Sequence, residues 1–290
     1  MNVFPFVFIV NMRERKERKD KMELLMQKIG ITEYEFIIPV NITEETIPEE
    51  YRKNGMNKGN TSLNLTILTK IIPKVQQKKR DFIIMEDDLM SMIPTENIKS
   101  YILELIQNVP KDWNMIYLEY CLEMCSLAKE IPTNIHIKKA FKPYCAAAIL
   151  FRYENIDSVV NCIETKKNPL SFTYSSCIRE NKIVAYISDP PIFSQDISMQ
   201  GDIDHISSPW NIHFYLNRIL KMYDTNTTES KPRLPSCIDS VETLSYIRWW
   251  NVCWILLVIL FVIGFYNCVF ISTKKKNYIR IVSGIFDFGK

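Results

Sequence analysis

The sequence predicts an α/β domain with a mostly parallel sheet, followed by a transmembrane helix. Short apolar runs typical of strands alternate with segments whose apolar residues recur at i, i+3, i+4 and i+7. This alternation favours a sheet whose two faces are both covered by helices. Residues 249–273 contain no charged side chain. At about 1.5 Å per residue, a helix of this length exceeds a hydrocarbon core of about 30 Å.

The predicted elements follow one another in order along the chain. Residues 3–10 are apolar but have neither a basic segment before them nor a small-residue cleavage site, so we expect a strand rather than a signal peptide. Further strands are expected at residues 34–40, 82–85, 114–119, 145–151 and 183–187. Amphipathic helices are expected around residues 22–29, 65–75, 98–105, 156–163 and 212–219.

Composition divides the chain into four parts. We expect a globular domain over residues 1–222, a linker rich in Thr, Ser and Pro over 223–248, the transmembrane helix over 249–273 and a basic tail over 274–290. With only seven glycines, the chain has no Gly-rich phosphate loop, which argues against a dinucleotide cofactor. A net charge of +3 gives no support to a nucleic-acid partner, and we expect none.

The sequence leaves open which side of the membrane holds the domain. A first strand in place of a signal peptide would leave the domain in the cytosol, with the C-terminal helix as a late-inserted anchor. A slight excess of basic residues after the predicted span instead favours a cytosolic tail. Four Asn-x-Ser/Thr sequons also permit a lumenal domain; they begin at Asn41, Asn60, Asn64 and Asn226.

Six of the eight cysteines precede the predicted span: Cys121, Cys125, Cys145, Cys162, Cys177 and Cys237. Cys121 and Cys125 are four residues apart, without a second pair or a histidine at the spacing of a zinc site. An even number of cysteines permits disulfides in an oxidising compartment. In a domain of this size, however, we expect buried free thiols.

Three consecutive carboxylates follow the apolar run at residues 82–85. Glu86, Asp87 and Asp88 repel one another unless a cation lies among them, and the C-terminal end of a strand is where an α/β sheet exposes its functional loops. Hard divalent ions such as Mg²⁺ and Mn²⁺ bind oxygen ligands and keep coordination positions for phosphates. The alternative is a solvated acidic turn.

Basic residues follow the first predicted strand and open the first predicted helix. Asn11, Arg13, Arg15 and Arg18 would lie at the C-terminal edge of that strand. Guanidinium groups bind phosphate oxygens through paired hydrogen bonds, and the start of a helix adds N–H donors and a favourable dipole. The alternative is a solvated helix face with internal Glu–Lys pairs. Together with the acidic strand end, the basic cluster predicts a site for a nucleotide diphosphate shared by arginines and a metal.

Four segments resemble glycosyltransferase family 25, in the order that this family has them. Residues 8–22 resemble the family's opening strand, its run of arginines and its first amphipathic helix. Residues 84–88 resemble its Leu-Glu-Asp-Asp metal motif, residues 112–118 its Trp-Asp-x-Ile-x-Leu strand, and residues 190–198 its Pro-x-x-x-Gln stretch. The resemblance covers about residues 3–205, and motifs in order are more specific than any single one.

This resemblance implies a GT-A fold, a nucleotide-sugar donor that is often UDP-galactose, and a divalent metal, Mn²⁺ or Mg²⁺. It implies that Asp88 holds the metal and that Asp87 and Glu86 contact the metal or the ribose. It also implies that Asn11, Arg13 and Arg18 belong to the donor site.

Two features of the family are absent from this chain. A Ser-His pair before the acidic strand is here Ser62-Leu63, and an acid expected near residues 169–170 gives way to Ser-Phe-Thr-Tyr at 171–174. If that acid is the base that deprotonates the acceptor, the chain needs another base or has lost activity. The candidate bases are Asp196 and Glu119. His205, flanked by acids, is a candidate further metal ligand, with a surface histidine as the alternative.

The expected function is therefore a membrane-anchored, metal-dependent transfer of a hexose, galactose by the resemblance, from a UDP-sugar to a hydroxyl group of a glycan, protein or lipid. An alternative is a degenerate relative that keeps the fold as a membrane-bound binding or scaffolding module. A membrane adaptor without sugar chemistry would require the ordered motifs to be accidental.

Overall fold

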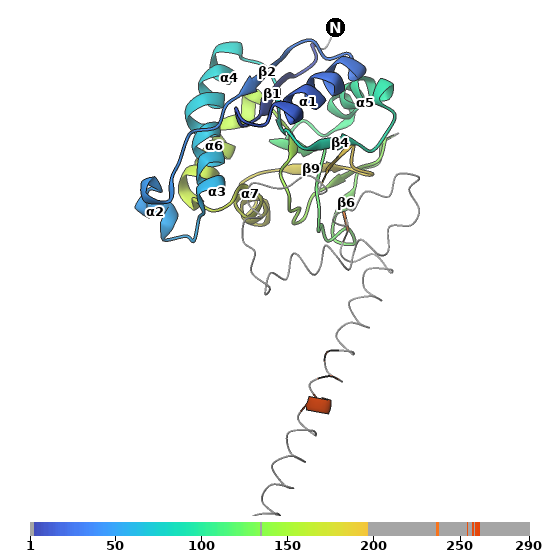
Figure 1. Ribbon diagram of the computed structural model, residues 1–290. Helices are drawn as coiled ribbons and strands as arrows, with labels where there is room; N and C mark the ends of the chain where they lie inside the picture. Colours follow the sequence, from blue (N-terminus) through green and yellow to red (C-terminus); the bar gives the residue numbers. More distant parts are fainter. Residues whose placement is uncertain are drawn as a thin grey trace, which may run out of the picture. The chain divides into compact units, whose positions relative to one another are not determined.

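The computed structural model describes residues 3–133, 135–196, 236, 237, 254, 257 and 259–261. The chain divides into two units, Met1–Ile238 and Asp239–Lys290. The first unit holds the sheet and the helices that position the candidate site (Figure 1).

The central sheet has eight strands in the order β2-β1-β3-β8-β5-β9-β7-β6. The strands are β1 (Phe6–Val10), β2 (Tyr34–Ile37), β3 (Phe82–Glu86), β5 (Met115–Tyr117), β6 (Lys129–Glu130), β7 (Ile137–Lys139), β8 (Ala148–Phe151) and β9 (Ala185–Ser188). The pairings place β7 and β8 opposite in direction to all the others, so the predicted α/β class with a mostly parallel sheet is confirmed. A second, two-stranded antiparallel sheet joins β4 (Leu89–Ser91) to β10 (Phe193–Gln195).

All six predicted strands are present, most of them shorter than predicted. The helices are α1 (Lys16–Ile29), α2 (Glu49–Arg52), α3 (Lys58–Thr66), α4 (Ile72–Lys78), α5 (Thr95–Asn108), α6 (Ile156–Lys166) and α7 (Leu170–Arg179). A π-type turn, Ile67–Ile71, joins α3 to α4. Gly30 ends α1 in the left-handed conformation, at φ 75°, which a residue without a side chain adopts at little cost. The helix predicted around residues 212–219 lies outside the described residues.

Alternate residues of β1 face two separate hydrophobic cores, because successive side chains of a strand point to opposite faces. Phe6, Phe8 and Val10 pack in the core covered by α4, α6 and α7. Val7 and Ile9 pack in the core covered by α1 and α5. Both faces of the sheet are therefore covered, as the sequence predicts (Figure 1).

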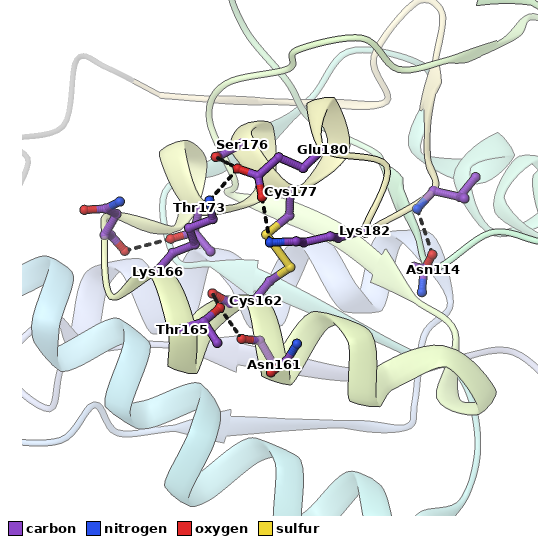
Figure 2. Close-up of a disulfide and its surroundings, with 12 residues drawn as sticks. Asn114, Asn161, Cys162, Thr165, Lys166, Thr173, Ser176, Cys177, Glu180 and Lys182 are labelled. Atoms are coloured by element: carbon purple, nitrogen blue, oxygen red, sulfur yellow. Dashed lines mark hydrogen bonds and ion pairs between the residues drawn. A yellow bond between two sulfur atoms is a disulfide. The ribbon is translucent and has the colours of Figure 1, made fainter.

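Three disulfides join the six cysteines of the domain, so the expectation of free thiols is wrong. Cys121 pairs with Cys145, and Cys125 pairs with Cys237. The third disulfide, Cys162–Cys177, joins α6 to α7 (Figure 2). Sequence spacing could not reveal these pairs, since each links residues that only the folded chain brings to a Cα–Cα distance of 5.4–6.4 Å.

The second disulfide also bears on the predicted domain boundary. Cys237 lies within the predicted linker, residues 223–248, and its covalent bond to Cys125 attaches that part of the chain to the domain. A protein truncated at residue 222 would leave the Cys125 thiol without its partner.

No helix within the described part of the chain is long and apolar enough to cross a membrane. Of the predicted span, only Trp254, Leu257 and residues 259–261 are described. The transmembrane helix stays a prediction.

Glu123 holds together two loops, the one after β5 and the one after β7. Its carboxylate accepts hydrogen bonds from the backbone N–H groups of Met124 at 2.7 Å, Phe141 at 3.2 Å and Lys142 at 2.9 Å. The Glu123 side chain is fully buried. A carboxylate suits this place because it only accepts hydrogen bonds, and these backbone groups only donate them.

Glu123→Gln should lower the free energy of unfolding by about 2 kcal/mol, because the amide group would turn a donor toward N–H groups and the charge-assisted bonds would be lost. Urea denaturation of the full chain measures this loss. Glu130→Gln is the control, since the Glu130 side chain is 82% exposed, and it should change the free energy little. Equal stability of the two variants would show that the buried carboxylate does not hold these loops.

Candidate functional site

Polar side chains gather where β1, β3 and β5 end. These strands run in one direction, so their carboxyl ends lie at the same edge of the sheet. Val10, the last residue of β1, pairs with Glu86, the last residue of β3. β8 runs in the opposite direction and therefore begins at this edge, which brings Ala147 beside Glu119.

Asp87 binds the start of α1 to the end of β3. Its Oδ2 accepts a hydrogen bond from Asn11 Nδ2 at 2.7 Å, and its Oδ1 accepts one from Arg18 Nη1 at 2.9 Å. All three residues are buried. The predicted acidic and basic clusters are thus in direct contact. Both carboxylate oxygens of Asp87 are already bound by protein donors, so these contacts do not support its predicted role as a metal ligand.

Asp88 differs from its neighbour in having an oxygen without a hydrogen-bond donor. Its Oδ1 is buried and has no hydrogen-bond partner among the described residues, while its Oδ2 lies 3.9 Å from Arg18 Nη1. Burial raises the pKa of the Asp88 carboxyl to about 6; Arg18 opposes this shift and Asp87 adds to it. An unsatisfied buried oxygen of this kind costs about 1–3 kcal/mol or more. A bound cation would remove that cost.

Glu86 and Glu119 complete the acidic cluster. Burial and, after it, the charges of Asp88 and Glu119 together raise the pKa of Glu86 to about 8, although a 3.0 Å hydrogen bond from Gln195 Nε2 opposes the rise. Burial also raises the pKa of Glu119 to about 8, although Ala147 N–H donates to its carboxylate at 3.1 Å. The carboxyl groups of Glu86, Asp88 and Glu119 therefore lie close enough to repel one another when ionised.

Asp196 directly follows β10 and contacts the backbone of Asp88. Its backbone N–H donates to the Asp88 carbonyl oxygen at 2.7 Å. Its buried carboxylate forms a 3.0 Å ion pair with Lys21 Nζ of α1. Because Lys21 already binds this carboxylate, the pairing does not support Asp196 as the base.

The other predicted residues lie in the loop before α1 or outside the described residues. Arg13 is exposed in the loop between β1 and α1, and Arg15 is half-buried there. His205 lies outside the described residues. Lys21 is a site residue that the sequence reasoning missed; its place one helical turn after Arg18, on the same face of α1, is the signal that could have revealed it.

A metal site made by protein side chains alone is absent from the described part of the chain. Within residues 3–133 and 135–196 no group of three His, Cys, Asp or Glu side chains is arranged to hold a metal ion. Mg²⁺ is commonly held by one or two carboxylates together with substrate phosphates and water. The unsatisfied Oδ1 of Asp88 fits that second arrangement, in which the substrate supplies the remaining ligands.

The raised pKa values predict how stability depends on pH without a metal. In the folded protein Glu86 and Glu119 keep their protons up to about pH 8, whereas in the unfolded chain they lose them near the ordinary value of 4.5. The folded state binds more protons across this window, so the free energy of unfolding should fall as pH rises through it. Urea denaturation across this pH range, in a chelator, measures the slope.

Glu119→Gln should make this decrease smaller, because the amide does not ionise. The control is Glu104→Gln, which changes an exposed residue of α5 and should leave the slope unchanged. A stability that rises with pH in wild type and in both variants would contradict the account of the acidic cluster.

Comparison with known proteins leaves the function to be argued from this geometry. No family model and no curated protein matches the chain. Among solved structures, the crystal structure of apo UDP-glucose pyrophosphorylase is similar over 63% of this chain and 72% of that chain, at 10% sequence identity and a TM-score of 0.35. A TM-score of this size carries no argument about function.

Proposed function

We propose that the protein is a metal-dependent glycosyltransferase of the GT-A type, which moves a hexose from a UDP-sugar to a hydroxyl acceptor. The observation that carries this proposal is the unsatisfied, buried Asp88 Oδ1 beside the arginine-bearing start of α1. The ordered resemblance to glycosyltransferase family 25 supports the reaction class, and its usual donor supports galactose.

Asp88 is the residue that would hold Mn²⁺ or Mg²⁺ through Oδ1. When bound, the metal would neutralise the diphosphate as it leaves the sugar. Asp87 instead holds Arg18 and Asn11, and with them the start of α1, in a fixed place. N–H groups at a fixed helix start can stabilise a phosphate without reorganising during the reaction.

The loop that leads into α1 carries an exposed positive charge that would contact the phosphates of the donor. Arg13 is exposed in the loop that leads into α1, and it forms no ion pair with a described residue. An exposed guanidinium group beside the start of a 14-residue helix is suited to bind phosphate oxygens. This assigns Arg13 to the donor phosphates and leaves Arg18 to structure.

Glu119 is the stronger candidate for the base. Its pKa of about 8 is close to the pH at which proton transfer is most efficient, and it lies at the same edge of the sheet as Asp88. Asp196 is less suited because Lys21 holds its carboxylate.

Glu119→Gln should lower kcat by about 100-fold with little change in KM for the donor, since the amide cannot accept the proton of the acceptor. Steady-state release of UDP by the full chain in detergent, with Mn²⁺ and a candidate acceptor, gives both constants. Glu104→Gln is the matched control. An unchanged kcat for Glu119→Gln would assign the base to another residue.

One observation favours the second candidate function, a binding module without turnover. The segment at residues 171–174, where the family resemblance expects an acid nearby, lies in α7, and Thr173 and Tyr174 are buried in the core. This segment therefore supplies no carboxylate to the site. Binding of UDP with Mn²⁺ but no UDP release from any UDP-hexose, in the presence of acceptors, would favour the binding module.

A further inference from the structure

The disulfides use every cysteine that precedes the predicted membrane span. Six thiols form three pairs and none is left over. The three bonds join separate parts of the domain. The segment after β5 is joined to the segment before β8 by one bond and to residue 237 by another, and the third bond joins α6 to α7. Cytosolic proteins seldom hold such a set, because cellular reductants keep their thiols reduced.

The Cys162–Cys177 disulfide lies inside the folded core. Both cysteines are buried between α6 and α7 (Figure 2). Beside them the Glu180 carboxylate accepts hydrogen bonds from Ser176 at 2.9 Å and from Lys182 at 2.7 Å, and it also forms an ion pair with Lys166. The same two helices are thus joined by a covalent bond and by a group of polar contacts.

The three described sequons differ in how exposed their asparagine is, and therefore in whether the folded domain could carry a glycan on it. Asn41 is exposed in the loop after β2, and Thr43 of the same sequon is exposed as well. Asn64 is fully buried, and its Nδ2 donates to the Asn168 carbonyl at 3.0 Å. Asn60 is half-buried next to the buried Thr61. Only Asn41, among these three, is open to a bulky modification without disrupting the core.

We propose that the domain folds in an oxidising compartment and that Asn41 carries an N-linked glycan there. The disulfides favour such a compartment, and the exposed sequon provides the acceptor. The excess of basic residues after residue 273 supports this orientation, because it favours a cytosolic tail. This inference is independent of the sugar-transfer proposal, since it concerns the place of folding rather than the site.

Expression of the epitope-tagged full chain in cultured eukaryotic cells tests the glycan. Peptide N-glycosidase should increase the electrophoretic mobility of the wild type. Asn41→Gln should remove one glycan increment, and Asn64→Gln should remove none. Thr43→Ala should remove the same increment as Asn41→Gln, whereas Thr43→Ser, which keeps the sequon, should retain it.

Thiol labelling of the same samples tests the compartment. A maleimide-polymer reagent, applied under denaturing conditions, should label the six domain cysteines only after reduction, because all six are paired. Absence of a glycan increment that depends on both Asn41 and Thr43 would overturn the proposal. Labelling of the six cysteines before reduction would overturn it equally.

Discussion

Replacing Asp88 by Asn should lower the release of UDP from a UDP-hexose by about 1,000-fold or more. The amide binds a divalent cation weakly, and the loss of the metal removes several kcal/mol of stabilisation from the departing diphosphate. About 4 kcal/mol corresponds to a factor of 1,000 in rate. The experiment uses the full chain in detergent with Mn²⁺, a panel of UDP-hexoses and candidate acceptors.

Two comparisons make this result specific to the metal. Asp20→Asn changes an exposed carboxylate of α1, the helix that carries Arg18, and should leave the rate unchanged. Asp88→Asn should also keep the wild-type stability or gain some in the absence of metal, because the neutral amide removes a buried charge that burial disfavours. Equal rates for Asp88→Asn and wild type, in a chain that turns over, would show that Asp88 does not hold a catalytic metal.

Arg18→Met should lower the free energy of unfolding by about 3–5 kcal/mol, because it leaves the buried Asp87 carboxylate without its cation. Lys19→Met is the matched control. The Lys19 side chain is about half exposed; it forms an ion pair with the similarly exposed Glu23 and lies 5.4 Å from the centroid of the Phe36 ring. Its loss should change the free energy by less than about 1 kcal/mol. Urea denaturation compares the two variants.

A double-mutant cycle separates the ion pair from other effects of Arg18. Asp87→Asn should be much less destabilising in the Arg18→Met background than in the wild type, since the charge that lacks a partner is then removed. Additive losses in the cycle would mean that Arg18 and Asp87 act independently. That result would contradict the structural role given to this pair and would return Asp87 to the candidates for the metal.

The sheet and the helices next to the site could be predicted because their signals are local. Each of β1, β3 and α1 shows its whole pattern within its own residues. Because both faces of the sheet are buried, β1 and β3 are continuous apolar runs, which are easy to recognise. From the strand order it follows that Asn11 and Asp87 meet, since neighbouring parallel strands end at one edge. Strands of two or three residues, such as β6 and β10, contain too few residues for any period to show.

The missed features have identifiable physical causes. The helix α7 was not predicted, although most of its buried residues follow helical spacing; these are Leu170, Thr173, Tyr174, Cys177 and Ile178. The disulfides and the Lys21–Asp196 pair join residues between 15 and 175 positions apart, so only the fold could reveal them.

The different surroundings of Asp87 and Asp88 likewise could not be predicted. Adjacent residues at a strand end point in different directions, and the sequence does not indicate which of the two carboxylates will meet Arg18.

The most direct test of the central claim measures Mn²⁺ binding by electron paramagnetic resonance, with the full chain in detergent, with and without UDP. If Asp88 and the diphosphate share the metal, UDP should strengthen Mn²⁺ binding, and Mn²⁺ should strengthen UDP binding by the same factor. Asp88→Asn should abolish this coupling, and Asp20→Asn should retain it. Mn²⁺ binding that is the same with and without UDP, and the same in wild type and Asp88→Asn, would contradict the claim.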